Sequence, residues 1–364
     1  MAKQAESKLR VGIIGVGGIG NVHLKAFEAV TDAEVVAICD IRPERLEEMA
    51  AEYEIADSYD DYEDLLARKD IDAVSICTPN DLHAPITIAA LKAGKHVLCE
   101  KPLTTSMSEA LAMTNAAKAA KKALVVAFSH RRRGDVQWLK QAVGDGLFGD
   151  LYYAKAMWMR RSGIPSWGAW FIDKTRAGGG PLIDLGVHML DMSLYLLGEP
   201  RVLSVSASTY SELGPQGKGY FYPPTHGQEF TVEDLASAFI RLEGGKTLTL
   251  EASWATYGKY NDAFGVSLFG TKGGAELEIV DYTDKDTLRV FTDIGGAPVE
   301  MQPAPTVGHG HTSVAREFTD LILNGDPTSQ AGLDGVRRAQ VIQAIYQSAL
   351  EGREIAIEDL ASLL

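Results

Sequence analysis

The 364-residue sequence has few cysteines, no long apolar run and no excess of basic residues. Cys39, Cys77 and Cys99 cannot form a full disulfide set, and each lies in a short apolar run, which predicts small buried side chains in a reducing compartment. No window approaches the roughly 18 apolar residues of a membrane-spanning helix. The polar N-terminal segment lacks the apolar stretch of a signal peptide. We therefore expect a cytoplasmic protein without a membrane partner.

Acidic residues outnumber basic ones, and the formal net charge is -14. Because neutralising phosphates requires a basic surface, this balance argues against nucleic acid as a partner. The short basic run Arg131–Arg133 is interpreted as the solvated end of an element, or, at Arg131, as a candidate substrate contact. An apolar fraction of 46% is typical of a globular protein, and the length predicts two domains.

Residues 1–128 alternate short apolar runs, rich in β-branched side chains, with amphipathic stretches. Strand, helix and strand in repeated order predict parallel pairing with right-handed crossovers, and helices covering both faces. We therefore predict a doubly wound α/β (Rossmann) domain that binds a dinucleotide. The predicted strands are Arg10–Gly15, Val35–Asp40, Ala73–Thr78, Lys95–Glu100 and Ala123–Ser129. The predicted helices lie near Ile19–Val30, Pro43–Tyr53, Pro85–Ala93 and Ser106–Ala120.

Residues 129–364 follow a different pattern, with long strand-like segments in succession. Phe230–Leu242 and Lys246–Trp254 flank Gly244-Gly245, which predicts a β-hairpin whose glycines have positive φ. Other candidate strands are Tyr152–Arg160, Val202–Tyr210, Ala263–Gly270 and Leu288–Thr292. We predict an α+β domain with an open, mainly antiparallel sheet. Helices near Pro181–Leu197, Thr312–Leu323 and Leu333–Glu351 should cover one face. The other face is expected to form the interface of a homodimer or homotetramer.

A G-x-G-x-x-G motif at Gly15, Gly17 and Gly20 follows the first predicted strand and opens a helix. The first glycine allows a tight turn, the second lets the backbone approach a pyrophosphate, and the third lets the helix pack on the strand. Backbone N–H groups of the first helical turn, at Gly18 and Ile19, and the helix dipole would hold the phosphates. A glycine-rich turn without a ligand is the alternative.

Asp40 ends the second predicted strand about 20 residues after the motif, where an acidic side chain hydrogen-bonds the adenosine ribose. Its carboxylate would repel a 2′-phosphate, so NAD is favoured over NADP. Arg42 is the reservation, because a guanidinium there accommodates the 2′-phosphate. None of the cysteines has metal-ligand spacing, and no metal is expected.

The fifth predicted strand ends in Glu100-Lys101-Pro102. Ligands of doubly wound folds bind at the carboxyl ends of the strands, so Lys101 is expected to point at the cofactor crevice. Read alone, the same three residues are equally typical of a surface turn.

A second candidate segment is the helix after Gly178–Gly180. Asp184 and His188 lie one turn apart on it, which suits a general base and the carboxylate that orients it. A satisfied polar network at a helix end is the alternative. Asp191 and Tyr195, on the same stripe, are assigned to such a network.

Four blocks in this order resemble the Gfo/Idh/MocA family (glucose-fructose oxidoreductase, inositol dehydrogenase, rhizopine catabolism) over nearly the whole chain. They are GVGGIG at Gly15–Gly20, TPNDLH at Thr78–His83, AGKHVLCEKP at Ala93–Pro102 and GGGPLIDLGVHMLD at Gly178–Asp191. The resemblance implies a Rossmann domain followed by an open antiparallel sheet that often mediates dimers or tetramers.

The resemblance also implies roles for single residues. His188 would remove a hydroxyl proton while C4 of the nicotinamide takes hydride from the same carbon, and Asp184 would orient the imidazole. Lys101 would lie by the nicotinamide ribose and stabilise charge on the substrate oxygen. The Lys101–Pro102 bond would be cis. Residues implied to line the cofactor groove are Thr78, Asn80, His83 and, at the nicotinamide end, Glu100.

Aromatic residues before the catalytic helix are candidates to stack on a sugar ring, although an aromatic core under a loop is the alternative. They are Trp158, Trp167 and Trp170. Some relatives carry Trp-Arg where this chain has Trp170-Phe171, which weakens any claim to NADP.

The resulting prediction is an NAD-dependent dehydrogenase acting on a ring hydroxyl of a sugar, sugar derivative or inositol. The alternatives are a self-recycling oxidoreductase or lyase with tightly held NAD, and a dihydrodiol-type dehydrogenase. A catalytically inactive regulator is disfavoured, because Lys101 and His188 are both present.

Overall fold

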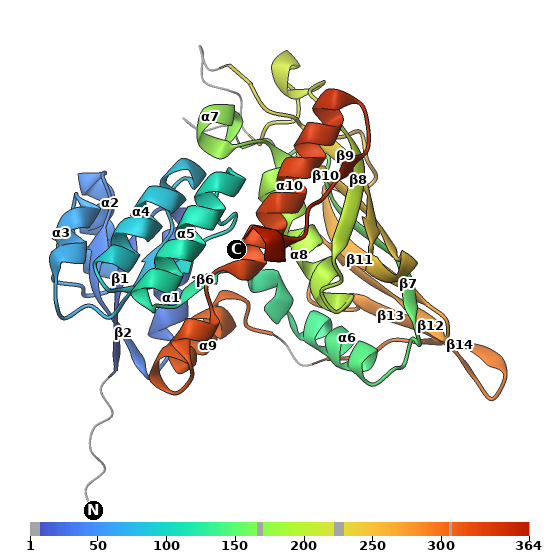
Figure 1. The fold of residues 1–364 in the computed structure, drawn as a ribbon, viewed down its shortest axis with the longest axis horizontal. Helices are drawn as coiled ribbons and strands as arrows, with labels where there is room; N and C mark the ends of the chain where they lie inside the picture. The colour runs from blue at the N-terminus through green and yellow to red at the C-terminus, as the bar shows by residue number, and fades with distance from the viewer. Residues whose placement is uncertain (1–7, 166–169, 222–228, 306–307, 364) are drawn as a thin grey trace, which may run out of the picture. The chain divides into compact units, whose positions relative to one another are not determined.

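The structure, a computed structural model, describes residues 8–165, 170–221, 229–305 and 308–363. The chain divides into two compact units (Figure 1). The first comprises Met1–Ser129 and His309–Val336, and the second His130–Gly308 and Arg337–Leu364. The first change of unit falls at residues 129 and 130, and residues 309–336, which were assigned to the second domain from sequence, group with the first unit. No described helix is long and apolar enough to cross a membrane.

The first unit holds a six-stranded, all-parallel sheet in the order β3-β2-β1-β4-β5-β6. The five predicted strands are confirmed as β1 (Leu9–Ile14), β2 (Ala33–Cys39), β4 (Ala73–Ile76), β5 (His96–Cys99) and β6 (Leu124–Val126). The edge strand β3 (Ser58–Tyr59) has only two residues, too few to give a periodic pattern. The connecting helices are α1 (Gly18–Glu28), α2 (Pro43–Glu52), α3 (Tyr62–Ala67), α4 (Asn80–Lys92) and α5 (Met107–Ala120).

Helix α9 (His311–Leu323) joins this unit from the far end of the chain (Figure 1). Its apolar stripe, Val314, Ala315 and Phe318, is buried in the same core as Leu9 of β1 and Phe27 of α1. The helical period predicts that α9 exists, but it does not say which sheet the stripe covers. The prediction that α9 covers the antiparallel sheet is therefore wrong.

The second unit is built on a nine-stranded sheet in the order β14-β13-β12-β11-β7-β10-β9-β8-β15. Only the β10–β7 pair is parallel. The strands are β7 (Leu151–Arg160), β8 (Val202–Tyr210), β9 (Leu235–Leu242), β10 (Thr247–Ser253), β11 (Asp262–Gly270), β12 (Gly273–Val280), β13 (Leu288–Ile294), β14 (Ala297–Met301) and β15 (Ile355–Ala356). The predicted hairpin is β9–β10, and Gly244 and Gly245 both have φ of 75°.

The helices of this unit are α6 (Gly134–Gly144), α7 (Lys174–Ala177), α8 (Val187–Leu196) and the greater part of α10 (Leu333–Glu351). The predicted helix 181–197 begins instead with a π-helical turn, Leu182–Gly186, before α8 continues it. Helix α8 packs on β7 and β11, and all but one of its residues are buried.

A buried ion pair fixes α8. Arg131 donates two hydrogen bonds to the Asp191 carboxylate, of 2.6 and 2.5 Å, and Arg338 of α10 donates a third of 2.9 Å. The Arg131 side chain is only 10% exposed. Its guanidinium therefore belongs to a buried network, and its role as a substrate contact stays a prediction. Asp191 does belong to a structural network, as predicted.

Candidate active site

The glycine motif forms a tight turn between β1 and α1. Gly15 has φ of +86°, and a Cβ there would lie 2.7 Å from the carbonyl oxygen of Cys77. A Cβ on Gly20 would lie 2.0 Å from the carbonyl oxygen of Gly15, so both positions require glycine. Among the described residues, and apart from the neighbouring residues and backbone of its own helix, no atom lies within 4 Å of the Cβ position of Gly18, at the start of α1. The turn thus presents an uncrowded backbone at a helix N-terminus, which suits a pyrophosphate.

Asp40 follows β2 beside this turn, with 8% of its surface exposed. Its carboxylate accepts hydrogen bonds from the backbone N–H of Val16 (3.0 Å) and from Arg42 Nε (2.9 Å) and Nη2 (3.0 Å). Burial alone would raise the pKa of Asp40, but these donors and the guanidinium charge hold it below its ordinary value. The carboxylate of Asp40, which is predicted to bind the adenosine ribose, is therefore ionised and paired with Arg42.

Thr78 follows β4, which neighbours β1 where the strand order reverses, and open α/β sheets bind ligands at such a point. Among the described residues, its buried hydroxyl has no hydrogen-bond partner. An unsatisfied buried hydroxyl costs about 1 to 3 kcal/mol, so an external partner is expected. With the glycine turn, this orphaned hydroxyl fits a bound dinucleotide. Asn80, the first residue of α4, is 6% exposed.

His83 of α4 is only 1% exposed. Its ring nitrogens lie 2.7 Å from the carbonyl oxygen of Pro102 and 3.0 Å from that of Thr78. Burial lowers the pKa of His83, although the two carbonyls favour the charged ring. Both ring nitrogens therefore contact backbone carbonyl oxygens, and the place of His83 in the cofactor groove stays a prediction.

The Glu100-Lys101-Pro102 turn follows β5, and the Lys101–Pro102 bond is cis, as expected. Glu100 is 4% exposed, and its carboxylate lies 2.8 Å from His23 Nε2 and 3.2 Å from His311 Nε2. Burial alone would raise the pKa of Glu100, but the two imidazoles hold it well below its usual range. Lys101 is half-buried, and its backbone N–H donates to Glu100 Oε2 at 3.0 Å.

His23, Glu100 and His311 are also the one set among the described residues whose ligand atoms, all within 4.8 Å, are grouped closely enough for a metal ion. The direct hydrogen bonds already satisfy these atoms. Sequence reasoning missed both histidines. His23 lies on the helix after the glycine motif, but no spacing signal links it to Glu100, and none links Glu100 to a residue 211 positions later.

In the second unit, Asp184 lies in the π-helical turn and His188 in the first turn of α8. π-turns are frequent at functional sites. Asp184 Oδ2 accepts a 3.0 Å hydrogen bond from the indole of Trp254, the largest fully buried side chain described. The ring of His130 lies 4.5 Å from that of His188, between centroids. Neither Trp254 nor His130 was singled out from the sequence.

Trp158, predicted to stack on a sugar, is only 3% exposed. Its ring stacks on Phe264 at 4.4 Å, and its indole N–H donates to Asp262 at 2.7 Å. It therefore belongs to the aromatic core that was the alternative interpretation. Trp170 stacks on Phe171 at 3.9 Å and is half-buried, so its sugar-stacking role stays a prediction. Trp167 lies outside the described residues.

Arg160 of β7 brings a positive charge close to Asp184. It donates to Asp262 at 2.7 Å and to the Tyr282 hydroxyl at 2.9 Å. Burial alone would lower the pKa of Arg160, but the acidic groups of Tyr282, Asp262 and Asp184 raise it. This charge is a permanent part of the surroundings of Asp184.

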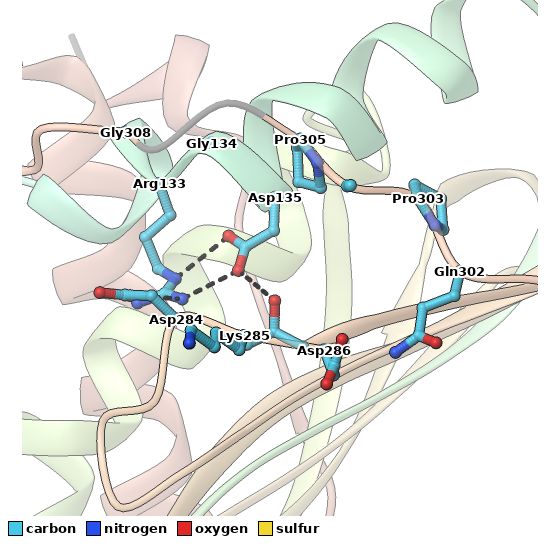
Figure 2. A pocket seen from close by; sticks show the side chains of 12 residues that line it. Arg133, Gly134, Asp135, Asp284, Lys285, Asp286, Gln302, Pro303, Pro305 and Gly308 are labelled. Carbon is cyan, nitrogen blue, oxygen red and sulfur yellow. Dashed lines mark hydrogen bonds and ion pairs between the residues drawn. The ribbon is translucent and has the colours of Figure 1, made fainter.

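A cavity of about 360 Å³ in the second unit lies among α6, the segment 284–287 and the segment before α9 (Figure 2). Among its charged groups, Arg133 is paired with Asp135 and with Asp284. Arg133 donates to Asp135 at 3.1 and 2.8 Å, and Thr287 donates to the same carboxylate at 2.8 Å. None of the predicted site residues lines this cavity.

The two units together match a known family. Residues 9–128 match the model described as "Oxidoreductase family, NAD-binding Rossmann fold", and residues 136–276 match the "GFO/IDH/MocA C-terminal domain". The chain therefore belongs to the GFO/IDH/MocA family of NAD-binding oxidoreductases.

Several full-length relatives are sugar or inositol dehydrogenases. D-glucoside 3-dehydrogenase of Escherichia coli strain K12 is 34% identical, covering 96% of this chain and 98% of the relative. Myo-inositol 2-dehydrogenase of Thermotoga maritima is 28% identical, covering 97% and 99%. Levoglucosan dehydrogenase, solved with NADH and levoglucosan, superposes with a TM-score of 0.84 at 27% identity, covering 97% of this chain and 100% of that one.

Proposed function

We propose that the chain is an NAD-dependent dehydrogenase that oxidises a ring hydroxyl of a sugar, a sugar derivative or an inositol. The observation that carries the proposal is the full-length similarity to the glucoside dehydrogenase. The three residues proposed to carry out the reaction, Lys101, Asp184 and His188, are present in this chain. Glucosides, with oxidation at carbon 3, are therefore the first substrate class to test.

Bound NAD would supply the hydride acceptor. His188 takes the proton of the substrate hydroxyl, because a neutral imidazole accepts a proton near physiological pH. Asp184, held by the Trp254 indole, orients the imidazole and favours its charged form. The ammonium group of Lys101 offsets negative charge as it develops on the substrate oxygen. Lys101 belongs to the first unit and the other two residues to the second.

The experiment is a panel of glucosides, anhydrosugars and inositols assayed with NAD, with the appearance of NADH as the readout. His188→Ala and Lys101→Met serve as inactive controls. We expect NADH with at least one glycoside or inositol and at least a 100-fold loss of rate in both variants, the size seen when an oxyanion donor is removed. NADH formation that persists in both variants would refute the residue roles.

A second candidate is a self-recycling oxidoreductase that keeps its nucleotide bound. It is favoured by the similarity to aldose-aldose oxidoreductase of Caulobacter crescentus, at 26% identity and a TM-score of 0.79. Denaturing the purified protein and measuring the released nucleotide separates the two candidates. A stoichiometric nucleotide that survives dialysis supports the second, and an empty protein that needs added NAD supports the first.

A further inference from the structure

Glu100 is a buried charge at the carboxyl end of β5, and every oxygen of its side chain is engaged. Oε1 contacts Nε2 of His23 and Nε2 of His311, while Oε2 accepts the backbone N–H of Lys101 at 3.0 Å. Glu100 N–H in turn donates to the carbonyl oxygen of Ile76 in β4. The carboxylate thus links the two imidazoles directly to the backbone of the proposed catalytic lysine.

The two histidines differ in how they are held. His23 of α1 is 2% exposed, and its second nitrogen lies 2.7 Å from the Ser75 hydroxyl of β4, so it is fixed from both sides. The side chain of His311 is 23% exposed and stands at the first residue of α9. Its ring centroid lies 5.2 Å from that of His23. His311 is therefore the member of the network whose side chain can be replaced with the least disturbance of the core.

The topology places this network in one half of the cofactor crevice. In a doubly wound sheet the dinucleotide crosses the carboxyl ends of the strands at the point where the order reverses, here between β1 and β4. Asp40 after β2 marks the adenosine half, so the end of β5 lies in the nicotinamide half. Oxidised nicotinamide is positively charged and reduced nicotinamide is neutral, so a carboxylate on this side favours the oxidised cofactor.

We propose that His311 is a positioning residue: through Glu100 it fixes the backbone from which Lys101 projects, and it moderates the negative charge presented to the nicotinamide. The kinetic part rests on the proposed function, and the cofactor-binding part does not. The segment that carries His311, residues 309–336, returns to the first unit after residues 130–308 of the second unit, so the lysine turn is supported by a residue distant in the sequence.

The test compares His311→Ala with His311→Gln. The glutamine amide reaches about as far as Nε2 and keeps a neutral donor for Glu100, whereas alanine removes it. A displaced catalytic group costs up to about 100-fold in rate. We therefore expect kcat of the alanine variant to fall about 10-fold or more with KM nearly unchanged, and glutamine to restore most of it. Arg316→Ala, on an exposed position of the same helix, is the matched control and should keep wild-type values.

The second readout needs no substrate. Dissociation constants for NAD and NADH are measured by calorimetry on all four proteins. Losing a donor makes the Glu100 carboxylate effectively more negative, which favours the positively charged oxidised nicotinamide. In His311→Ala the dissociation constant for NAD should therefore fall several-fold relative to that for NADH. This readout stands even if no sugar is ever oxidised, which separates failure of the inference from failure of the proposed function.

Three results would overturn the inference. One is an unchanged cofactor ratio in His311→Ala. Another is a glutamine variant as slow as alanine, which would mean that hydrogen-bond donation is not what His311 contributes. The third is a stoichiometric metal ion in the purified protein that is lost in both His311 variants, because the three side chains would then be metal ligands.

Discussion

The Arg42 guanidinium donates two hydrogen bonds to the Asp40 carboxylate, of 2.9 and 3.0 Å, at the position predicted to bind the adenosine ribose and to discriminate NAD from NADP. A lone carboxylate would repel a 2′-phosphate, whereas this pair is electrically balanced. The Arg42 side chain is 56% exposed and can turn toward a ligand. The preference for NAD should therefore be moderate, because Arg42 offsets the charge that creates it.

Reciprocal variants test this balance. Arg42→Ala leaves Asp40 uncompensated, so the ratio of kcat/KM for NAD over NADP should rise by roughly 10-fold, a change of about 1.4 kcal/mol. Asp40→Ser frees the guanidinium and should move the ratio in the opposite direction by a similar factor. Steady-state kinetics with both cofactors give the answer. Ratios that move the same way in both variants would show that the pair does not set the preference.

The hydroxyl of Thr78 should serve the cofactor rather than the fold. Thr78→Val removes a buried hydroxyl that has no partner among the described residues, so thermal stability should not fall. The dissociation constant for NAD should rise about 5-fold, for the loss of roughly 1 kcal/mol. The control Thr114→Val removes a hydroxyl that donates to the carbonyl oxygen of Ala331. In this variant thermal stability should fall, and the dissociation constant for NAD should stay unchanged. Calorimetric binding and thermal melts measure both.

Arg131 should matter for stability and not for substrate affinity. Arg131→Met leaves the fully buried Asp191 with one guanidinium fewer, and breaking a buried pair costs about 3 to 5 kcal/mol. Arg338→Met, which removes the other donor, should cost about as much. Urea unfolding measures both. A stable Arg131 variant with a raised KM would return this residue to the substrate site.

The sequence predicts those parts of the molecule whose cause is local. The glycine turn and the β9–β10 hairpin follow from short motifs, and the structure has both. The cis Lys101–Pro102 bond, which the family resemblance implied, is also present. Long-range partners leave no such trace. The stripe of α9 shows an amphipathic helix but not the sheet that it covers. β12 begins with Gly273-Gly274, which reads as a turn, yet it pairs along two neighbouring strands.

The same limit applies to the candidate site. Lys101, Asp184 and His188 stand in recognisable blocks, whereas the residues that hold them come from elsewhere in the chain. Trp254, which bonds Asp184, lies 70 residues away and has the alternating pattern of any strand end. Trp158 shows the opposite error. An aromatic residue near a proposed sugar site suggests stacking, but only its 3% exposure reveals that the ring is core.

The bond between Trp254 and Asp184 provides a test of the proposed base. Trp254→Phe keeps a ring in the core but removes the donor, so the Asp184 carboxylate becomes effectively more negative. A more negative neighbour stabilises the imidazolium of His188 if Asp184 orients it as proposed. More of the base is then protonated at a given pH, and the acidic limb of the rate profile for oxidation should move to higher pH.

Asp184→Asn removes the negative charge instead, so the same limb should move to lower pH as the rate drops. Both substitutions change the side-chain volume little, and the predicted pH shifts have opposite signs. A general loss of packing would not shift the limb in opposite directions. The measurement is kcat against pH for wild type, Trp254→Phe, Asp184→Asn and His188→Ala, with cofactor saturating. In His188→Ala the limb should disappear with most of the activity. Shifts in the same direction for Trp254→Phe and Asp184→Asn, or a limb that survives without His188, would assign the proton to another group.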